Sequence, residues 1–232
     1  MIYVFDVDGT LTDSRLPIDS DFKVFFLSFI SSNTVWLVTG SDKDKTIEQV
    51  GSDIWSGVSR VYQSCGNELY IGGDLQYMNT LELPPAYYSD LEFLLSSSAA
   101  PVKAGNHIEE RVGLVNFSTV GRSCTQDQRD AYYKWDSINQ ERKSMCEYLN
   151  GRYPDYEAVK GGQISIDIYK RGKNKAQILD HIHGEPFVFF GDHLEPGGND
   201  YPVKALSEQR GLEGTFHQVS GWRETMKLLK SA

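Results

Sequence analysis

Carboxylates follow the first apolar segment of the chain at a spacing that suits phosphoryl-transfer chemistry. Residues 2–5 (Ile-Tyr-Val-Phe) are typical of a short strand buried on both faces. Asp6 and Asp8 come directly after it, two residues apart, so we expect both on one side of the chain, and Gly9 permits the turn that follows. An Asp-x-Asp pair is by itself more often a solvated turn. Behind a buried strand, however, the pair predicts an oxygen-liganded Mg²⁺, with one Asp attacking phosphorus and the other moving a proton.

Polar residues also follow two apolar strands predicted further along. Residues 35–38 run into Thr39-Gly40-Ser41-Asp42, where a hydroxyl and free helix amides could hold a phosphoryl group or simply cap a helix. Residues 186–190 run into Gly191-Asp192. Because the carboxyl ends of parallel strands share one sheet edge, we expect Asp192 to join Asp6 and Asp8 there, which strengthens the prediction of a magnesium site.

Lys175 begins a helical stretch, and a lysine at that point could neutralise a phosphorylated aspartate. A surface lysine is the default interpretation. Upstream, Asp19 or Ser20 is expected to cap a helix that runs to about residue 30. Further helices are predicted near residues 43–50, 88–95 and 221–230.

Residues 81–169 are expected to form an inserted domain. After the helix near residues 88–95 and a loop at residues 96–101, the period changes and the chain is expected to continue as strand, strand, long helix, strand, strand. The long helix should begin at a capping box of Thr125 and Gln128 and end at Asn150-Gly151. Its expected apolar line consists of Trp135, Ile138, Met145 and Leu149. Residues 164–168 alternate strictly, so Ser165 and Asp167 should share an available face opposite three isoleucines.

Two arginines at the start of the predicted long helix could bind an anion. Arg122 lies just before the capping box and Arg129 lies in the first helical turn. Guanidinium groups and free helix amides can converge on one phosphate, although two isolated arginines more often mark a solvated helix end.

Composition narrows the class of protein. The 232 residues carry 23 basic and 32 acidic side chains, a net charge of −9, and no run of Lys and Arg, so we expect no nucleic-acid partner. Three cysteines without C-x-x-C spacing indicate neither a disulfide framework nor a zinc site. The apolar run at residues 24–30 is too short to span a bilayer, and the chain opens with a strand rather than a secretory leader. A cytoplasmic location without membrane attachment is therefore expected.

The motifs together resemble a known superfamily. Asp6-Val7-Asp8-Gly9-Thr10 resembles the first motif of the haloacid dehalogenase (HAD) superfamily of phosphoryl-transfer enzymes, and Ser41, Lys175 and Asp192 match later motifs in order. Three further strings are similar to one branch, the eukaryotic-type phosphomannomutases. They are Gly121-Arg122-Ser123-Cys124 after Asn116, the run from Gly161 to Asp167, and Phe189-Phe190-Gly191-Asp192 with Pro196-Gly197-Gly198-Asn199-Asp200.

The resemblance implies an α/β fold. It predicts a HAD-like Rossmannoid core with a mainly parallel sheet, formed by residues 1–80 and 170–232, and an inserted α+β cap at residues 81–169. The implied activity interconverts hexose 6-phosphate and hexose 1-phosphate, mannose most of all, through an aspartyl-phosphate and a hexose 1,6-bisphosphate that also serves as activator. A homodimer joined through the cap is implied as well.

The resemblance also implies roles for individual residues. Asp6 would be the nucleophile and Asp8 the general acid/base, while Ser41 and Lys175 would hold the transferring phosphoryl group. The implied Mg²⁺ ligands come from Asp6, Asp8 through its backbone, Asp192 and Asp200. The implied substrate-binding residues of the cap are Arg111, Asn116, Arg122, Arg129, Ser165 and Asp167.

The chain departs from the family pattern at Thr39, at Glu110 and Val112 beside Arg111, and at His193 after Asp192. None of these departures removes a catalytic group, but the same nucleophile and cap could instead release phosphate to water. A Mg²⁺-dependent sugar-phosphate phosphatase is therefore the alternative. A third interpretation is a non-enzymatic protein that keeps the fold only for binding a ligand or a partner. Such a protein would be expected to have lost Asp6, Asp8 or Asp192, and all three are present.

Overall fold

The computed structural model describes residues 1–231, which divide into two compact units. Unit 1 comprises residues 1–79 and the chain from Lys173 onward, and unit 2 runs from Thr80 to Gly172. None of the helices in residues 1–231 is both long and apolar enough to cross a membrane.

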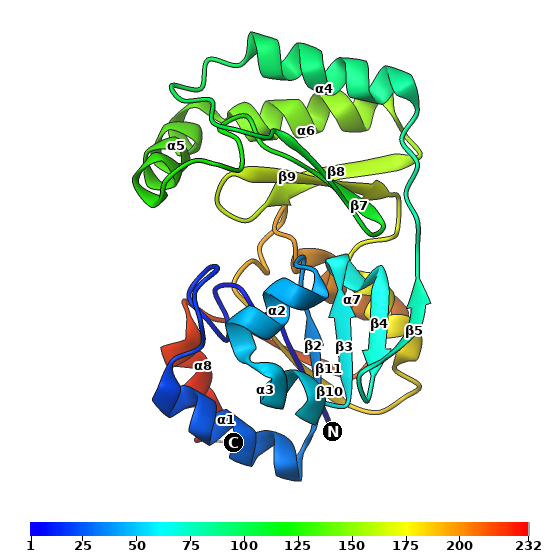
Figure 1. Ribbon diagram of the computed structural model, residues 1–232. Coiled ribbons are helices and arrows are strands. Elements are labelled where there is room, and N and C mark those ends of the chain that lie inside the picture. Colours follow the sequence, from blue (N-terminus) through cyan, green and yellow to red (C-terminus); the bar gives the residue numbers. More distant parts are fainter. Residues whose placement is uncertain (232) are drawn as a thin grey trace. The chain divides into compact units, whose positions relative to one another are not determined.

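Unit 1 is built on a seven-stranded sheet with the order β11-β10-β1-β2-β3-β4-β5 (Figure 1). The strands from β11 to β3 pair in parallel, whereas β3-β4 and β4-β5 pair antiparallel. The α/β class with a mainly parallel sheet is thereby confirmed. The strands are β1 (Ile2–Phe5), β2 (Thr34–Val38), β3 (Arg60–Gln63), β4 (Glu68–Ile71), β5 (Asp74–Met78), β10 (Phe187–Gly191) and β11 (Gly214–Gln218).

Helices cover both faces of this sheet, because strand residues alternate between two apolar cores. On β1, Phe5 packs into a core that includes Phe22 and Phe26 of α1, while Val4 packs into a second core that includes Ile178 and Val203. The predicted cap of α1 is confirmed, since Asp19 accepts from the backbone N–H groups of the first turn. The helices of unit 1 are α1 (Ser20–Ser32), α2 (Lys43–Val50), α3 (Ser52–Gly57), α7 (Tyr201–Arg210) and α8 (Trp222–Leu229), with 3₁₀ helices η1 (Ser64–Gly66) and η2 (Lys175–His181).

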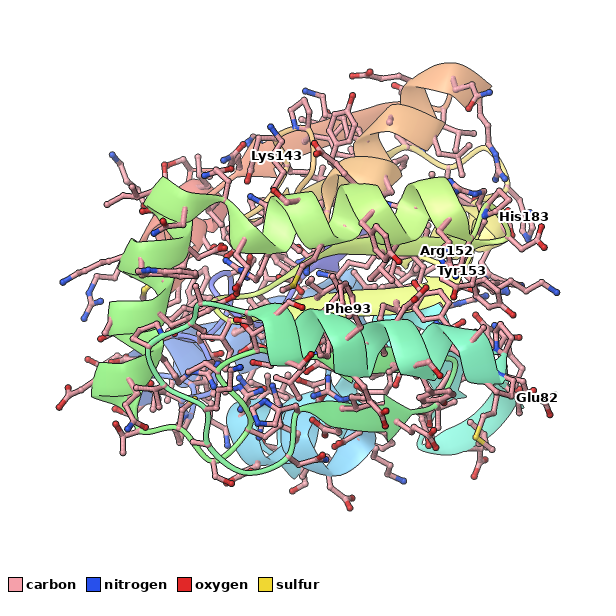
Figure 2. All side chains as sticks on the ribbon, turned by 90° about the horizontal axis from the view of Figure 1, so that it is seen from above. Glu82, Phe93, Lys143, Arg152, Tyr153 and His183 are labelled. Atoms are coloured by element: carbon pink, nitrogen blue, oxygen red, sulfur yellow. The ribbon has the colours of Figure 1, made fainter. Side chains whose placement is uncertain are left out.

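Unit 2 is an antiparallel four-stranded sheet with the order β6-β7-β9-β8. Two helices, α4 and α6, lie side by side over one face of it, and Figure 2 shows Phe93 on α4 and Arg152 at the end of α6. The strands are β6 (Ile108–Arg111), β7 (Leu114–Phe117), β8 (Tyr156–Gly161) and β9 (Ser165–Lys170). The helices are α4 (Pro85–Ser97), α5 (Gln126–Asn139) and α6 (Glu141–Arg152).

The prediction of a single long helix in the insert is wrong, because the structure has two helices there, α5 and α6. Its capping box is present, but the chain breaks at Gln140, which has a left-handed backbone conformation with φ 54°. The Asp136 carboxylate accepts the backbone N–H of Arg142 and pairs with its guanidinium, so the second helix starts from a new cap in a new direction. Ile138, expected on the apolar line, is 83% exposed, because the buried side of α5 carries Arg129, Tyr132 and Asp136 instead.

Strand β9 also differs from expectation. All of its residues from Ser165 to Tyr169 are buried, so the strand has no available face, and the expected exposure of Ser165 and Asp167 is wrong. Both side chains are engaged by polar neighbours of the same unit, Arg122 in one case and Asn116 in the other.

Candidate active site

The strand register of unit 1 brings the predicted acids to one sheet edge. Phe5 at the end of β1 is level with Phe190 of β10 and Leu37 of β2, and the Asp6 backbone N–H donates to the Phe190 carbonyl at 2.9 Å. The chain therefore leaves all three strands at the same edge. Ser41 lies in the turn after β2 at this edge, immediately before the Asp42 cap of α2.

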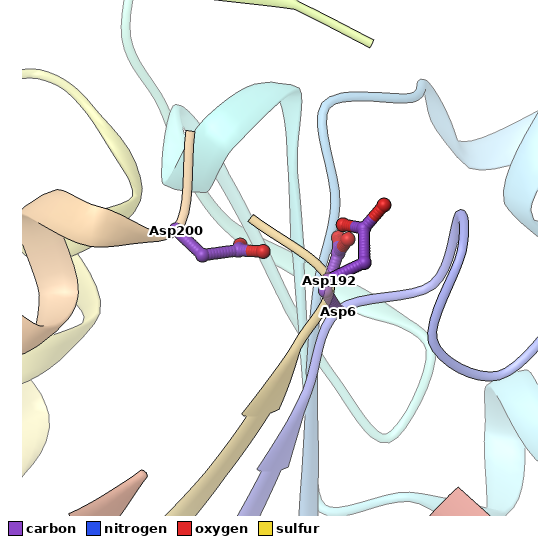
Figure 3. Close-up of side chains that lie close together, drawn as sticks. All are labelled: Asp6, Asp192 and Asp200. Carbon is purple, nitrogen blue, oxygen red and sulfur yellow. The ribbon is translucent and has the colours of Figure 1, made fainter. Parts of the chain in front are cut away.

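Three carboxylates meet beyond these strand ends. One carboxylate oxygen each from Asp6, Asp192 and Asp200 lie within 4.8 Å of one another (Figure 3). The backbone makes room for them, because a side chain at Gly191 would collide with the Asp200 carboxylate and one at Gly9 would collide with that of Asp192. Gly9 also has φ 77°, a conformation that favours glycine.

Lys175 lies among these acids rather than at the surface. Its Nζ donates to Asp6 Oδ1 at 2.6 Å and to Asp200 Oδ1 at 2.7 Å, and the side chain is 1% exposed. Burial alone would lower the pKa of Lys175, but the Asp200 and Asp6 carboxylates outweigh it and raise the pKa well above its usual value. The lysine is therefore a fixed positive charge beside Asp6.

One lysine does not balance three carboxylates. Burial, followed by the charge of Asp200, raises the pKa of Asp192 to about 7. Burial also raises the pKa of Asp6, and Lys175 offsets this only in part. Three oxygen donors with an uncompensated negative charge fit a hard divalent cation such as Mg²⁺. The donor set thus agrees with a metal site.

Asp8 has a different environment. Its Oδ1 accepts from the Arg15 backbone N–H at 2.7 Å and from Gln49 Nε2 at 2.9 Å, and the same amide donates to Thr12. These hydrogen bonds fix the orientation of the carboxylate next to the cluster. Asp8 contributes no oxygen to the group of three that lies within 4.8 Å, so a metal contact through its backbone remains a prediction.

The predicted cap residues form two polar clusters within unit 2. In the first, Glu109 Oε2 lies 2.9 Å from Arg111 Nη2 and 2.8 Å from Arg122 Nε. Arg122 also donates from Nη1 to the Ser165 hydroxyl at 3.4 Å. Arg129 lies in the first turn of α5 and is buried. Arginines from a strand, a loop and a helix therefore lie in the same small unit.

In the second cluster, Asn116 of β7 donates from Nδ2 to Asp167 Oδ1 of β9 at 2.6 Å. The two residues face each other in the strand register, and Gly161 on β8 leaves space that a side chain would deny to the Asp167 carboxylate. The Asn116 Oδ1 is buried and has no hydrogen-bond partner within residues 1–231. It is therefore a buried acceptor whose hydrogen-bonding capacity is unsatisfied.

A buried ion pair connects α5, α6 and the β8–β9 turn. Arg142 at the start of α6 pairs with Asp136 of α5 through Nε at 2.8 Å and donates from Nη1 to the carbonyls of Gly162 and Ser165 at 2.8 and 3.2 Å. The helix that carries Arg129 is thus joined to the β8–β9 turn at Gly162 and to the start of β9 at Ser165.

Sequence reasoning missed several residues of both sites. Gln49 gave no signal, because a glutamine inside a helix is unremarkable. The sequence did contain a signal for Glu109, because this residue is two positions from Arg111 on a strand and the two side chains must therefore lie on the same face. That Arg122 also reaches Glu109 depends on the fold of the intervening loop.

Comparison with known proteins identifies the family. The family model described as "Eukaryotic phosphomannomutase" matches residues 22–231. The chain belongs to the eukaryotic phosphomannomutase family. It is 31% identical over 243 residues to the phosphomannomutase of Drosophila melanogaster, covering 99% of this chain and 94% of that protein. It is 32% identical over 236 residues to the phosphomannomutase of Spinacia oleracea, covering 98% and 93%. The resemblance found in the motifs is confirmed, and the chain is an enzyme of the phosphomannomutase type.

Solved structures support the fold. A trehalose-6-phosphate phosphatase related protein has a TM-score of 0.60 at 17% identity, covering 100% of this chain and 96% of that one. At this identity the likeness concerns the HAD-like fold alone. The phosphomannomutase family and the fold therefore agree with the α/β architecture and the acidic cluster at the strand ends.

Proposed function

We propose that this member of the phosphomannomutase family interconverts hexose 6-phosphate and hexose 1-phosphate, with mannose the main sugar. The observation that carries the proposal is the pair of arginines around Glu109 in unit 2, near Ser165. A mutase must hold whichever phosphate of its bisphosphate is not reacting, whereas a phosphatase acting on a monophosphate needs no second anion site. Arg129 supports such a site as a donor to phosphate, and Asn116 supports it through an amide oxygen that can accept from a sugar hydroxyl.

In the proposed reaction, an Asp6 carboxylate oxygen attacks phosphorus of a hexose 1,6-bisphosphate activator, and the bond from phosphorus to the sugar oxygen breaks. Asp8 gives a proton to that departing oxygen. The phosphoryl group then passes from Asp6 to the free hydroxyl of a hexose monophosphate, whose proton Asp8 accepts. Lys175 stabilises the negative charge beside Asp6, and Ser41 holds the phosphoryl oxygens by hydrogen bonds.

Asp6, Asp192 and Asp200, with the Asp8 backbone, would hold Mg²⁺. Bound there, the ion neutralises charge on the phosphoryl oxygens and keeps the acids from repelling the substrate. We further propose a cytoplasmic homodimer joined through unit 2, on the family resemblance and the 60% exposure of Phe93 on α4. Light scattering of the purified chain tests the dimer.

The test of mutase against phosphatase compares two substrates. Replacing Arg122 or Arg129 with Ala should cost roughly 2–4 kcal/mol in transition-state binding for hexose phosphates, as the loss of a charge-assisted phosphate contact does. Hydrolysis of a small aryl phosphate, which has no distal phosphate, should continue much as before. Asp6→Asn should abolish both activities, and excess chelator should do the same.

Two results would move the assignment to the phosphatase. One is an equal loss on both substrates in the arginine variants. The other is steady release of inorganic phosphate from a hexose monophosphate with no isomer formed. Full activity of Asp6→Asn would contradict the nucleophile assignment itself.

A further inference from the structure

The two arginines of the proposed second anion site share one carboxylate. A single oxygen, Glu109 Oε2, lies 2.9 Å from Arg111 Nη2 and 2.8 Å from Arg122 Nε. The arrangement is built into the fold, because Glu109 and Arg111 project from the same face of β6, and the Arg122 backbone N–H donates to the Asn106 carbonyl just before that strand at 2.7 Å. All of these contacts lie within unit 2.

This carboxylate has two possible consequences for phosphate binding, and they have opposite signs. By accepting from both guanidinium groups, Glu109 holds two like charges close together and fixes their orientation, which favours binding of an anion. Its own negative charge, however, repels a phosphate dianion and engages N–H donors that a phosphate oxygen would use. Charges a few ångströms apart near a protein surface interact strongly enough to change an affinity by tenfold or more.

We propose that Glu109 is a built-in counter-anion that lowers the affinity of the Arg111–Arg122 pair for phosphate. The proposal rests on the proposed function, in which this pair binds the non-reacting phosphate. A mutase needs such a limit, because its bisphosphate must leave the second site and return in the opposite orientation. A site of two uncompensated guanidinium groups would hold the phosphate too long. When the phosphate leaves, the Glu109 carboxylate pairs with both guanidinium groups again, so that their positive charge stays compensated.

The substitution Glu109→Gln separates the two consequences. Glutamine has nearly the same shape, and its amide oxygen still accepts from the guanidinium groups, so their orientation is largely kept while the negative charge is removed. If the charge dominates, phosphate binds more tightly. If orientation dominates, phosphate binds no better or less well.

The measurement is titration calorimetry of mannose 6-phosphate into the full-length chain with Mg²⁺ and without any bisphosphate, so that no isomerisation occurs. Glu109→Gln should lower the dissociation constant about tenfold, which corresponds to about 1.4 kcal/mol. The difference from wild type should shrink as salt is raised, because screening weakens interactions between partly exposed charges. In turnover assays with a bisphosphate present, the same variant should show a lower kcat for isomerisation, because release becomes slower.

Glu110→Gln is the matched control. It makes the same change of net charge one residue away, on the opposite face of β6, where Glu110 accepts from the Tyr88 hydroxyl at 2.5 Å. The dissociation constant of this variant should equal that of wild type. A tightening as large as that of Glu109→Gln would show a general charge effect and overturn the proposal.

Arg122→Ala separates failure of this inference from failure of the proposed function. Weaker binding in Arg122→Ala together with unchanged or weaker binding in Glu109→Gln overturns the role of Glu109 and leaves the second anion site intact. Unchanged binding in Arg122→Ala removes the second anion site and the inference with it. Unfolding midpoints of all variants, measured alongside, identify any variant that fails to fold.

Discussion

Replacing Lys175 with Met should destabilise unit 1 more than any other single lysine substitution in it. The Nζ of Lys175 is 2.6 Å from Asp6 and 2.7 Å from Asp200, and the three side chains are at most 4% exposed. Removing one partner of a buried ion pair costs about 3–5 kcal/mol, because the other charge stays buried without compensation. Here one lysine serves two carboxylates, with a third nearby, so we expect about 4–5 kcal/mol in the absence of divalent cations.

Urea unfolding of the variant and the wild type, with chelator present, measures this loss. Adding Mg²⁺ should restore part of the stability, and more in Lys175→Met than in wild type, because a site with greater negative charge binds the cation more tightly and binding to the folded state stabilises it. The double variant Lys175→Met with Asp200→Asn should recover about half of the loss, since it removes one of the stranded charges. Lys227→Met, on the exposed side of α8, should stay within about 0.5 kcal/mol of wild type.

A loss below about 1 kcal/mol in chelator would refute the reasoning, because it would mean that the carboxylates are solvated or protonated rather than held by the lysine. Equal stabilisation of both proteins by Mg²⁺ would contradict the assignment of the cation to the same cluster.

Two further predictions concern titratable groups away from the acids. Burial, followed by the charge of Arg60, lowers the pKa of His181 below its usual value, so the unfolded chain binds a proton more readily than the folded one. The contribution of His181 to the free energy of unfolding should therefore fall as the pH drops below about 6.5. Relative to wild type, His181→Gln should gain stability toward the acid end of urea unfolding measured between about pH 5.5 and 7.5. Burial raises the pKa of Cys146 to about 12, so iodoacetamide at pH 8 should modify the partly exposed Cys124 first and reach Cys146 only on unfolding, as mass spectrometry of timed samples would show. Early modification of Cys146, or an unchanged pH profile in His181→Gln, would contradict these two expectations.

Local features of the fold were predictable because they depend on neighbouring residues. The strand before Asp6, the Asp19 cap of α1 and the capping box at Thr125 all follow from patterns a few residues long. The broken helix was not predictable in this way. Its cause is Asp136, whose carboxylate both caps the next helix and pairs with a buried arginine that reaches the β8–β9 turn.

The sequence by itself determined the types of the chemical groups and the order in which they occur. Strands that end in acids, with Gly and Ser at the turns, indicate a phosphoryl-transfer site at a sheet edge, since parallel strands deliver their carboxyl ends to one place. The motif strings identified the family. The same patterns placed two arginines and a polar strand face in the insert.

Only the tertiary structure decided which of these groups meet. Lys175 lies between Asp6 and Asp200. The residues alone left two interpretations of Lys175 open, a surface lysine and a partner of Asp6, and gave no sign of the contact with Asp200. Glu109 likewise reaches Arg122 only because a loop returns to the start of β6. Charge compensation depends on distances of a few ångströms, whereas sequence spacing fixes distances only along a single strand or helix, so these pairings arise from packing between elements.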